Sequence, residues 1–159
     1  MGVVTYDFEV SSPISPARLF KALVLEADKL FPKAAPHAIK SVELEGNGGP
    51  GSIVKINFAD GLPFQYVKHT VEGQDKDNLS YSYSLIEGGP LGEKLEKISY
   101  ENKFVAGADG GSVCKSLMKF YTVGDCTFTE DEIKEQIQRM DGVYEAVEAY
   151  LVANPDACN

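Results

Sequence analysis

A length of 159 residues suits a single domain over residues 1–159, because it can bury a core without disulfides or a structural metal. Hydrophobic residues make up 43% of the chain and charged residues 25%, which excludes a disordered protein. The net charge of −9 makes nucleic acid an unfavoured partner, and apolar runs such as Ala22-Leu23-Val24-Leu25 are too short to cross a membrane.

The cysteines and the N-terminal sequence indicate a cytoplasmic protein. Cys114, Cys126 and Cys158 are odd in number and widely spaced, which predicts free thiols in a reducing compartment. The first residues contain no basic stretch followed by an apolar one, so we expect no secretory signal. We also expect a monomer with no metal and no cofactor.

The first helix signals follow a strand that we expect over residues 3–11. Ser15 can cap a helix whose first position is Pro16, where the missing N–H of proline costs nothing. A second short helix is expected over residues 26–34, and Pro32 and Pro36 should break it.

Strands are predicted for most of the chain between these helices and the C-terminus. Residues 79–85 alternate between large apolar and small polar side chains, a pattern that requires a sheet with one buried face. Similar segments, separated by turns rich in Gly, Asp and Asn, cover residues 41–45, 53–58, 64–71, 95–105 and 112–122. With the first strand they predict an α+β fold with a seven-stranded, curved antiparallel sheet.

The strongest helix signal lies at the C-terminus. Thr129 can cap this helix, acidic residues fill its first turn, and Asn154-Pro155 ends it. Apolar side chains recur with helical spacing from Ile133 to Leu151. A helix of this length would be about 35 Å long, which is enough to cross a domain.

The sheet face that carries Tyr81 and Tyr83 is a candidate binding surface. Continuing the alternation onto neighbouring strands adds Phe58, Phe64, Tyr66, Ile98, Tyr100, Met118 and Phe120. Ligand pockets combine apolar walls with a few polar groups such as these hydroxyls, and His69 lies on a strand beside the tyrosines. An ordinary tyrosine-rich core explains the same pattern equally well.

Glycines are concentrated in the segment from Glu45 to Gly51, which contains Gly46, Asn47, Gly48 and Gly49. Such a loop could cradle phosphate, but the Lys-Ser/Thr ending of a nucleotide-binding loop is missing. A strand follows it instead of a helix whose N-terminus could hold phosphate. A turn between two strands is the favoured interpretation.

Four segments, residues 45–51, 81–92, 95–101 and 147–151, together resemble the plant pathogenesis-related class 10 proteins, the family of the major birch-pollen allergen. The resemblance covers the chain from Gly2 to Asn159. It implies the helix-grip fold, in which a seven-stranded sheet, two short helices and one long helix surround a hydrophobic cavity. It also implies a cytosolic protein, induced by stress or pathogens, that binds flavonoids, phytohormones, sterols or fatty acids and provokes IgE cross-reactivity.

The resemblance further implies which residues form the cavity wall. They would be Leu23, Phe31, Ile39, Ile56, Phe58, Phe64, Tyr66, Tyr81, Tyr83, Tyr100, Cys114, Ser116, Met118, Phe120, Gln136, Ile137, Met140 and Val143. Ile137 replaces a usual lysine and Met140 a usual small residue, which implies a narrower and less polar cavity. The expected partner is a small amphiphilic molecule, with the protein as its carrier or buffer.

An enzymatic function is an alternative. Ribonuclease activity is reported across the family and assigned to the glycine-rich loop with residues that match Lys55, Glu96, Glu148 and Tyr150. Acid–base catalysis requires these side chains close together, and we expect no basic groove for RNA. Relatives in alkaloid biosynthesis use a pocket lysine, whereas Lys115 and Lys119 should point outward here.

Hormone reception is a further alternative, as in the distantly related abscisic-acid receptors, which inhibit phosphatases when a gate loop closes. Gly61-Leu62-Pro63 resembles that gate. Gly88-Gly89-Pro90-Leu91 does not resemble the matching latch. We therefore favour ligand binding without catalysis.

Overall fold

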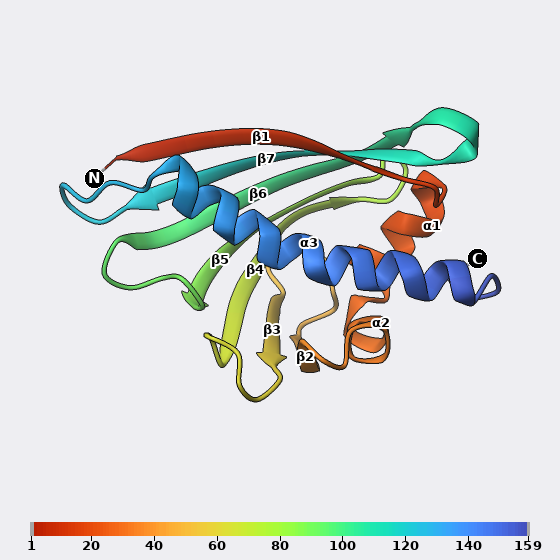
Figure 1. Cartoon of the computed structure of the whole chain (residues 1–159), viewed down its shortest axis with the longest axis horizontal. Helices are drawn as coiled ribbons and strands as arrows, with labels where there is room; N and C mark the ends of the chain where they lie inside the picture. Colours follow the sequence, from red (N-terminus) through yellow and green to blue (C-terminus); the bar gives the residue numbers. More distant parts are fainter. Residues whose placement is uncertain (1, 159) are drawn as a thin grey trace.

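Seven antiparallel strands form one curved sheet in this computed structural model, which describes residues 2–158 (Figure 1). The strands are β1 (Val3–Ser12), β2 (Ile39–Glu45), β3 (Ile53–Phe58), β4 (Tyr66–Asp75), β5 (Ser80–Gly88), β6 (Leu95–Ala106) and β7 (Ser112–Thr122). Their spatial order is β1-β7-β6-β5-β4-β3-β2, so the first strand lies beside the last. Because successive side chains alternate between faces, the sheet has an apolar inner face and a polar outer face.

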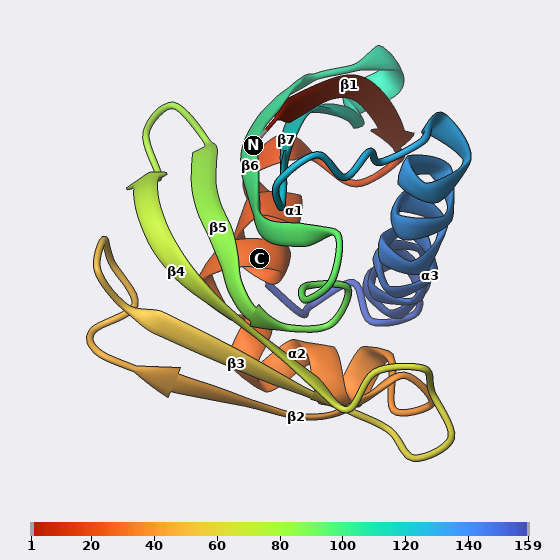
Figure 2. The ribbon, with the colours of Figure 1, turned by 90° about the vertical axis from the view of Figure 1, so that its left-hand side faces the viewer.

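The long helix lies on the concave side of the sheet, and the short helices precede β2 (Figure 2). The helical elements are α1 (Pro16–Phe20), the π-helical turn η1 (Lys21–Leu25), α2 (Ala27–Ala34), the short 3-10 turn η2 (Ala108–Gly110) and α3 (Glu130–Ala153). Within residues 2–158, no helix is both long enough and apolar enough to span a membrane.

Helix α3 packs tightly near its two ends and loosely in its middle. It begins with a capping box, in which Thr129 Oγ1 accepts a hydrogen bond from Glu132 N and Thr129 N donates one to Glu132 Oε1, each at 3.2 Å. Its buried residues lie toward the two ends and are Ile133, Gln136, Val147 and Leu151. The middle of α3 therefore spans a space instead of resting on the sheet.

Two core clusters lie under the two ends of α3. The first core cluster consists of Ile14, Leu19, Phe20, Ala22, Leu30, Phe104, Cys114, Val147 and Leu151. The second core cluster consists of Leu85, Leu95, Ile98, Tyr100, Met118, Phe120 and Ile133. The described core is thus divided in two, which leaves the centre of the molecule for a cavity.

The predicted α+β helix-grip architecture is confirmed, but the prediction that Pro32 breaks the second helix is wrong. Pro32 lies inside α2, which ends at Ala34, two residues before Pro36. A proline in a helix removes one backbone hydrogen bond. Tertiary packing offsets this loss, because Leu30 of the same helix is only 6% exposed in the core.

Strand boundaries differ from the predicted ones at β4 and β5. β4 begins at Tyr66 and continues to Asp75, instead of covering residues 64–71. Leu79 has a φ of +53°, a left-handed conformation that no strand residue adopts, so β5 begins at Ser80. The shift at β4 places Phe64 in the preceding loop.

A candidate ligand cavity

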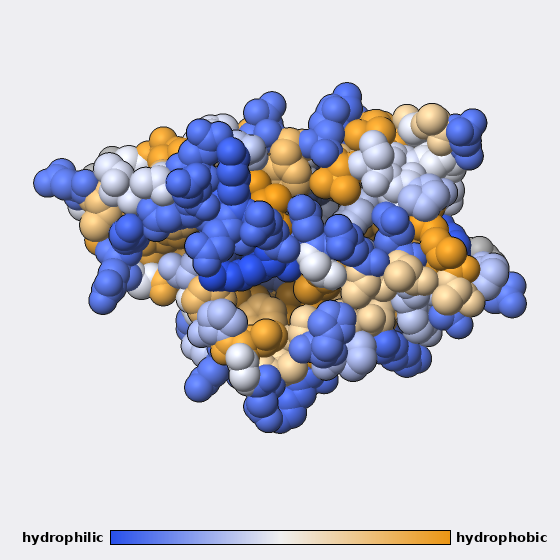
Figure 3. Space-filling view, in the orientation of Figure 1, coloured by the Kyte–Doolittle hydropathy of each residue, from blue (hydrophilic) through white to orange (hydrophobic). Residues whose placement is uncertain are grey.

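A cavity of about 960 Å³ lies between the sheet and the middle of α3. Its wall combines inward side chains of strands β1 to β7, residues of η1 and α2, and the middle of α3. Figure 3 shows the molecule hollowed below α3, with apolar residues in the depth of the hollow. Ligand pockets usually have volumes of about 300–1,000 Å³, so the space is large enough for a small organic molecule.

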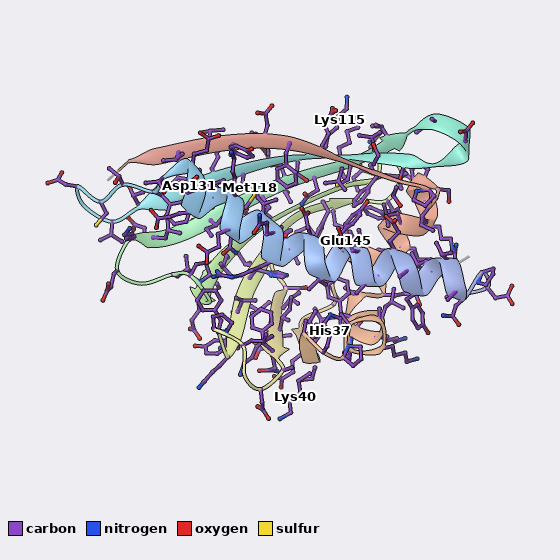
Figure 4. The ribbon with its side chains drawn as sticks, viewed as in Figure 1. His37, Lys40, Lys115, Met118, Asp131 and Glu145 are labelled. Atoms are coloured by element: carbon purple, nitrogen blue, oxygen red, sulfur yellow. The ribbon has the colours of Figure 1, made fainter. Side chains whose placement is uncertain are left out.

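Most of the residues that the resemblance assigned to the wall do lie on it. They are Leu23, Phe31, Ile39, Ile56, Phe58, Phe64, Tyr81, Tyr83, Tyr100, Cys114, Ser116, Gln136, Met140 and Val143. His69, chosen for its place beside the tyrosines, also lies on the wall, and so does the exposed His37 (Figure 4). Sheet and helix thus bring together side chains that are far apart in the sequence.

The prediction that Tyr66 lies on the wall is wrong, because Tyr66 points to the outer face of the sheet. Its hydroxyl donates a hydrogen bond to Glu87 at 2.7 Å, and Lys55 Nζ lies 5.0 Å from the centre of its ring. Because side chains alternate along β4 and Tyr66 points outward, the odd-numbered residues that follow it, including Val67 and His69, point inward.

Met118, Phe120 and Ile137 were also predicted on the wall and do not lie on it; Met118 and Phe120 belong to the second core cluster, and Ile137 packs against that cluster. Phe120 stacks on Phe128 at 5.0 Å between ring centres, and both Met118 and Phe120 are completely buried. Figure 4 shows Met118 close to the first turns of α3. At this end helix and sheet are in direct contact, so inward side chains fill the core instead of lining a space.

Aromatic rings form a continuous row on the floor of the cavity. His69 lies 4.5 Å from Tyr83, and Tyr83 stacks on Tyr100 at 4.5 Å with 18° between the ring planes. Tyr81 lies 5.1 Å from Tyr83 on the same strand. The row crosses β4, β5 and β6 and presents a broad aromatic surface to anything in the cavity.

Burial keeps this row uncharged. Desolvation lowers the pKa of His69 to about 4 and raises the pKa of Tyr81 to about 12. Desolvation also raises the pKa of Tyr83 and Tyr100 well above the ordinary value for a phenol. Near neutral pH the tyrosines therefore offer protonated hydroxyls and His69 a neutral imidazole, which can donate and accept hydrogen bonds.

Charged side chains are confined to the rim of the cavity. Those on the wall are Asp28, Lys29, Arg139 and Asp141, and none of the four is fully buried. Deeper in the cavity, Ser116 Oγ donates a hydrogen bond to Asn102 Oδ1 at 2.7 Å. The interior thus offers neutral polar groups on apolar walls.

The glycine-rich loop is a self-contained turn and does not cradle phosphate. Gly48 N donates to Ser52 Oγ at 3.0 Å, Gly49 N donates to Asn47 Oδ1 at 2.9 Å, and Gly51 N donates to Val71 O at 2.8 Å. These amides are therefore not available to an anion. Asn47, Gly48 and Gly49 lie on the cavity wall, whereas Gly46 and Gly51 do not.

The residues considered for ribonuclease activity are dispersed. Glu96 follows Lys94, whose Nζ lies 3.1 Å from Glu132 at the start of α3. Glu148 lies about 24 Å further along the helix axis, at about 1.5 Å per residue. Lys55 is on the outer face of the sheet. These groups therefore cannot act together on one reacting phosphate, which acid–base catalysis would require.

No other catalytic constellation emerges from the described residues. Lys115 points away from the cavity, as the alternation predicts, and lies 3.9 Å from Glu9 (Figure 4). Among residues 2–158, no group of three or more His, Cys, Asp or Glu side chains could hold a metal ion.

Several wall residues were not predicted. Val54, Val67 and Val71 lie two residues from Ile56 or His69 on the same strands, so strict alternation would have identified them. The sequence did not indicate that Arg139 lies on the wall, because a charged residue on a helix normally faces solvent.

A seven-stranded sheet wrapped around one long helix, with a cavity between them, defines a helix-grip protein. The model of the pathogenesis-related protein Bet v 1 family matches residues 1–154, and the chain belongs to this family. The resemblance to class 10 pathogenesis-related proteins is thereby confirmed.

Individual relatives support the same assignment. Major allergen Pru ar 1 of Prunus armeniaca is 51% identical over 160 residues, which cover 100% of both sequences. The structure of Ara h 8.0201 is 40% identical, has a TM-score of 0.85, and is matched over 96% of this chain and 100% of that one. Norcoclaurine synthase from Thalictrum flavum, solved with dopamine and hydroxybenzaldehyde, shares the fold at 18% identity, with a TM-score of 0.73 over 96% of this chain and 88% of that one.

Proposed function

We propose that this protein binds a small amphiphilic molecule in the cavity and acts as a carrier or buffer in plant stress or defence. In this proposal it works as a cytoplasmic monomer, without metal or cofactor. One observation carries the proposal: a cavity of about 960 Å³ with apolar walls contains a row of four aromatic side chains that offer neutral hydrogen-bonding groups.

The charge distribution favours a ligand whose buried part is uncharged. A charge moved from water into an apolar site costs several kcal/mol unless a partner charge is present. The charged side chains of the wall, such as Arg139 and Asp141, lie at the rim. Flavonoid- and sterol-like molecules and uncharged phytohormones satisfy this condition, whereas a fatty acid or an acidic phytohormone would have to keep its carboxylate at the rim.

A matched pair of fluorescent probes tests this ligand class. Phenylnaphthylamine is neutral, and anilinonaphthalene sulfonate adds one negative charge to the same ring system. We expect the neutral probe to bind at least about tenfold more tightly, because the sulfonate must stay near the rim and leave apolar area exposed. Fluorescence titration measures both affinities, and tighter binding of the sulfonate would contradict the assignment of an uncharged interior.

A cavity-filling variant tests the site itself. Ile56 points into the cavity from β3, and Ile53 lies on the same strand with an outward side chain. Ile56→Trp should weaken phenylnaphthylamine binding by narrowing the cavity beside β3, whereas Ile53→Trp should bind like the wild type. Circular dichroism establishes that both variants fold. The proposal fails if the wild type binds no member of a chemically varied probe panel.

An enzymatic role is a weaker candidate. Norcoclaurine synthase shares the fold, but the chemistry of an enzyme depends on the residues of its own site. Lys29 is the lysine on the described cavity wall, and it is exposed at the rim. A pocket lysine activated by burial is therefore not among the wall residues.

A further inference from the structure

The loop between β3 and β4 extends toward α3 at the rim of the cavity (Figure 2). Leu62, Pro63 and Phe64 of this loop line the cavity. The backbone hydrogen bonds described for the loop lie at its base, where Phe58 N donates to Gln65 O at 2.9 Å. None of the described backbone hydrogen bonds involves residues 60–64, so side-chain packing holds this part of the loop in place.

A contact joins the loop to the helix at Phe64, just before the loop enters β4. The guanidinium of Arg139, in the middle of α3, lies 4.8 Å from the centre of the Phe64 ring. Arg139 Nη2 also donates to Glu135 Oε1 at 2.7 Å, and Arg139 Nη1 donates to Gln136 Oε1 at 3.5 Å. The guanidinium is thereby held on the helix with a planar face available to the aromatic ring.

We propose that Arg139 and Phe64 form a clasp that holds the β3–β4 loop against α3 and limits how fast molecules enter and leave the cavity. A cation–π contact at an exposed site is weak enough to open often and strong enough to bias the loop toward closure. Loss of the contact should increase the open population about two- to fivefold. The part of this proposal that concerns ligand exchange depends on the proposed binding function.

Cys114 provides a test that needs no ligand. Its thiol is buried and lies on the cavity wall, so a small reagent must pass the rim to reach it. In a background of Cys126→Ser and Cys158→Ser, labelling by methyl methanethiosulfonate can be followed by mass spectrometry. We expect Arg139→Gln and Phe64→Leu to accelerate labelling about two- to fivefold, and the double variant to be no faster than either single one.

Lys134→Gln is the matched control. Lys134 is exposed on the same helix and lies 3.4 Å from Glu130, so this change removes one positive charge and one ion pair away from the cavity. It should leave the labelling rate unchanged, and Arg139→Lys should label more slowly than Arg139→Gln, because an ammonium also attracts the ring. Equal labelling in Arg139→Gln and its parent would overturn the clasp, provided that thermal unfolding shows equal global stability.

Stopped-flow kinetics with phenylnaphthylamine test the same clasp during binding. A clasp controls passage in both directions, so Arg139→Gln should raise both the association and the dissociation rate constants of the probe. A rise in the dissociation rate alone would show that Arg139 only contacts the ligand, and would overturn the clasp while leaving the binding function intact. Faster Cys114 labelling without any probe binding would instead remove the proposed function and leave the clasp.

Discussion

His69 is a titratable ring on an apolar wall, and its burial links its charge to folding. Desolvation lowers the pKa of His69 from 6.5 to about 4 in the folded protein. Between about pH 6.5 and pH 4 the unfolded chain therefore binds more protons than the folded one, and stability falls as the pH falls. Above about pH 6.5 the ring is neutral in both states and contributes no pH dependence.

We predict that His69 accounts for about 2–3 kcal/mol of the stability lost between about pH 7 and pH 4.5. Urea unfolding at these two pH values should show a smaller loss for His69→Gln than for the wild type, because glutamine does not titrate. His37→Gln, which changes an exposed histidine, should keep the wild-type loss. Equal losses in the wild type and His69→Gln would show that the ring is solvated before the protein unfolds.

At the scale of elements, α3 is fixed at both ends by groups from elsewhere in the chain. Near its start, Lys94 lies 3.1 Å from Glu132. At and just beyond its end, Arg18 of α1 donates to Leu151 O and Asn154 O at 2.7 Å each and to Ala157 O at 2.9 Å. The last carbonyls of a helix carry partial negative charge, so a guanidinium suits this place well. Such anchoring allows the middle of the helix to span the cavity.

Removal of the Arg18 side chain should loosen α3. We predict that Arg18→Met lowers the free energy of unfolding by about 2 kcal/mol, since hydrogen bonds from a charged donor are lost at partly buried carbonyls. Arg18→Lys should lose less, because the ammonium keeps the charge but cannot reproduce the planar fork. Urea unfolding measures both variants. Lys33→Met, an exposed cation at the end of α2, is the control and should stay near the wild type.

The elements themselves were largely predictable, because each depends on local pattern. Alternation identified β5, and Thr129 with the acidic turn after it identified the start of α3. The contacts of Arg18 could not be predicted, since they join residues more than 130 positions apart. The clasp between Arg139 and Phe64 depends in the same way on how a loop and a helix approach each other.

At the scale of the molecule, the position of the cavity depends on how α3 crosses the sheet. Met118 and Tyr100 occupy inward positions on adjacent strands and are paired in register. One lies in the second core cluster away from the cavity, and the other also reaches the cavity wall. Alternation assigns both residues to the inner face, so the sequence predicts this face but not which part of it remains uncovered. The aromatic pattern was compatible with either a ligand pocket or an ordinary core, and the family resemblance favoured the cavity.

Because the middle of the sheet's inner face is uncovered, we predict that a ligand bound in the cavity stabilises the whole protein. A ligand that binds only the folded state contributes about 2.7 kcal/mol at a free concentration of about 100 times Kd. For a chain of this length, that should raise Tm by about 5–10 °C. Calorimetry with phenylnaphthylamine should show this rise for the wild type and Ile53→Trp, and a much smaller one for Ile56→Trp. A rise of equal size in Ile56→Trp would mean that the probe does not occupy the space beside Ile56, because the larger side chain narrows the cavity there.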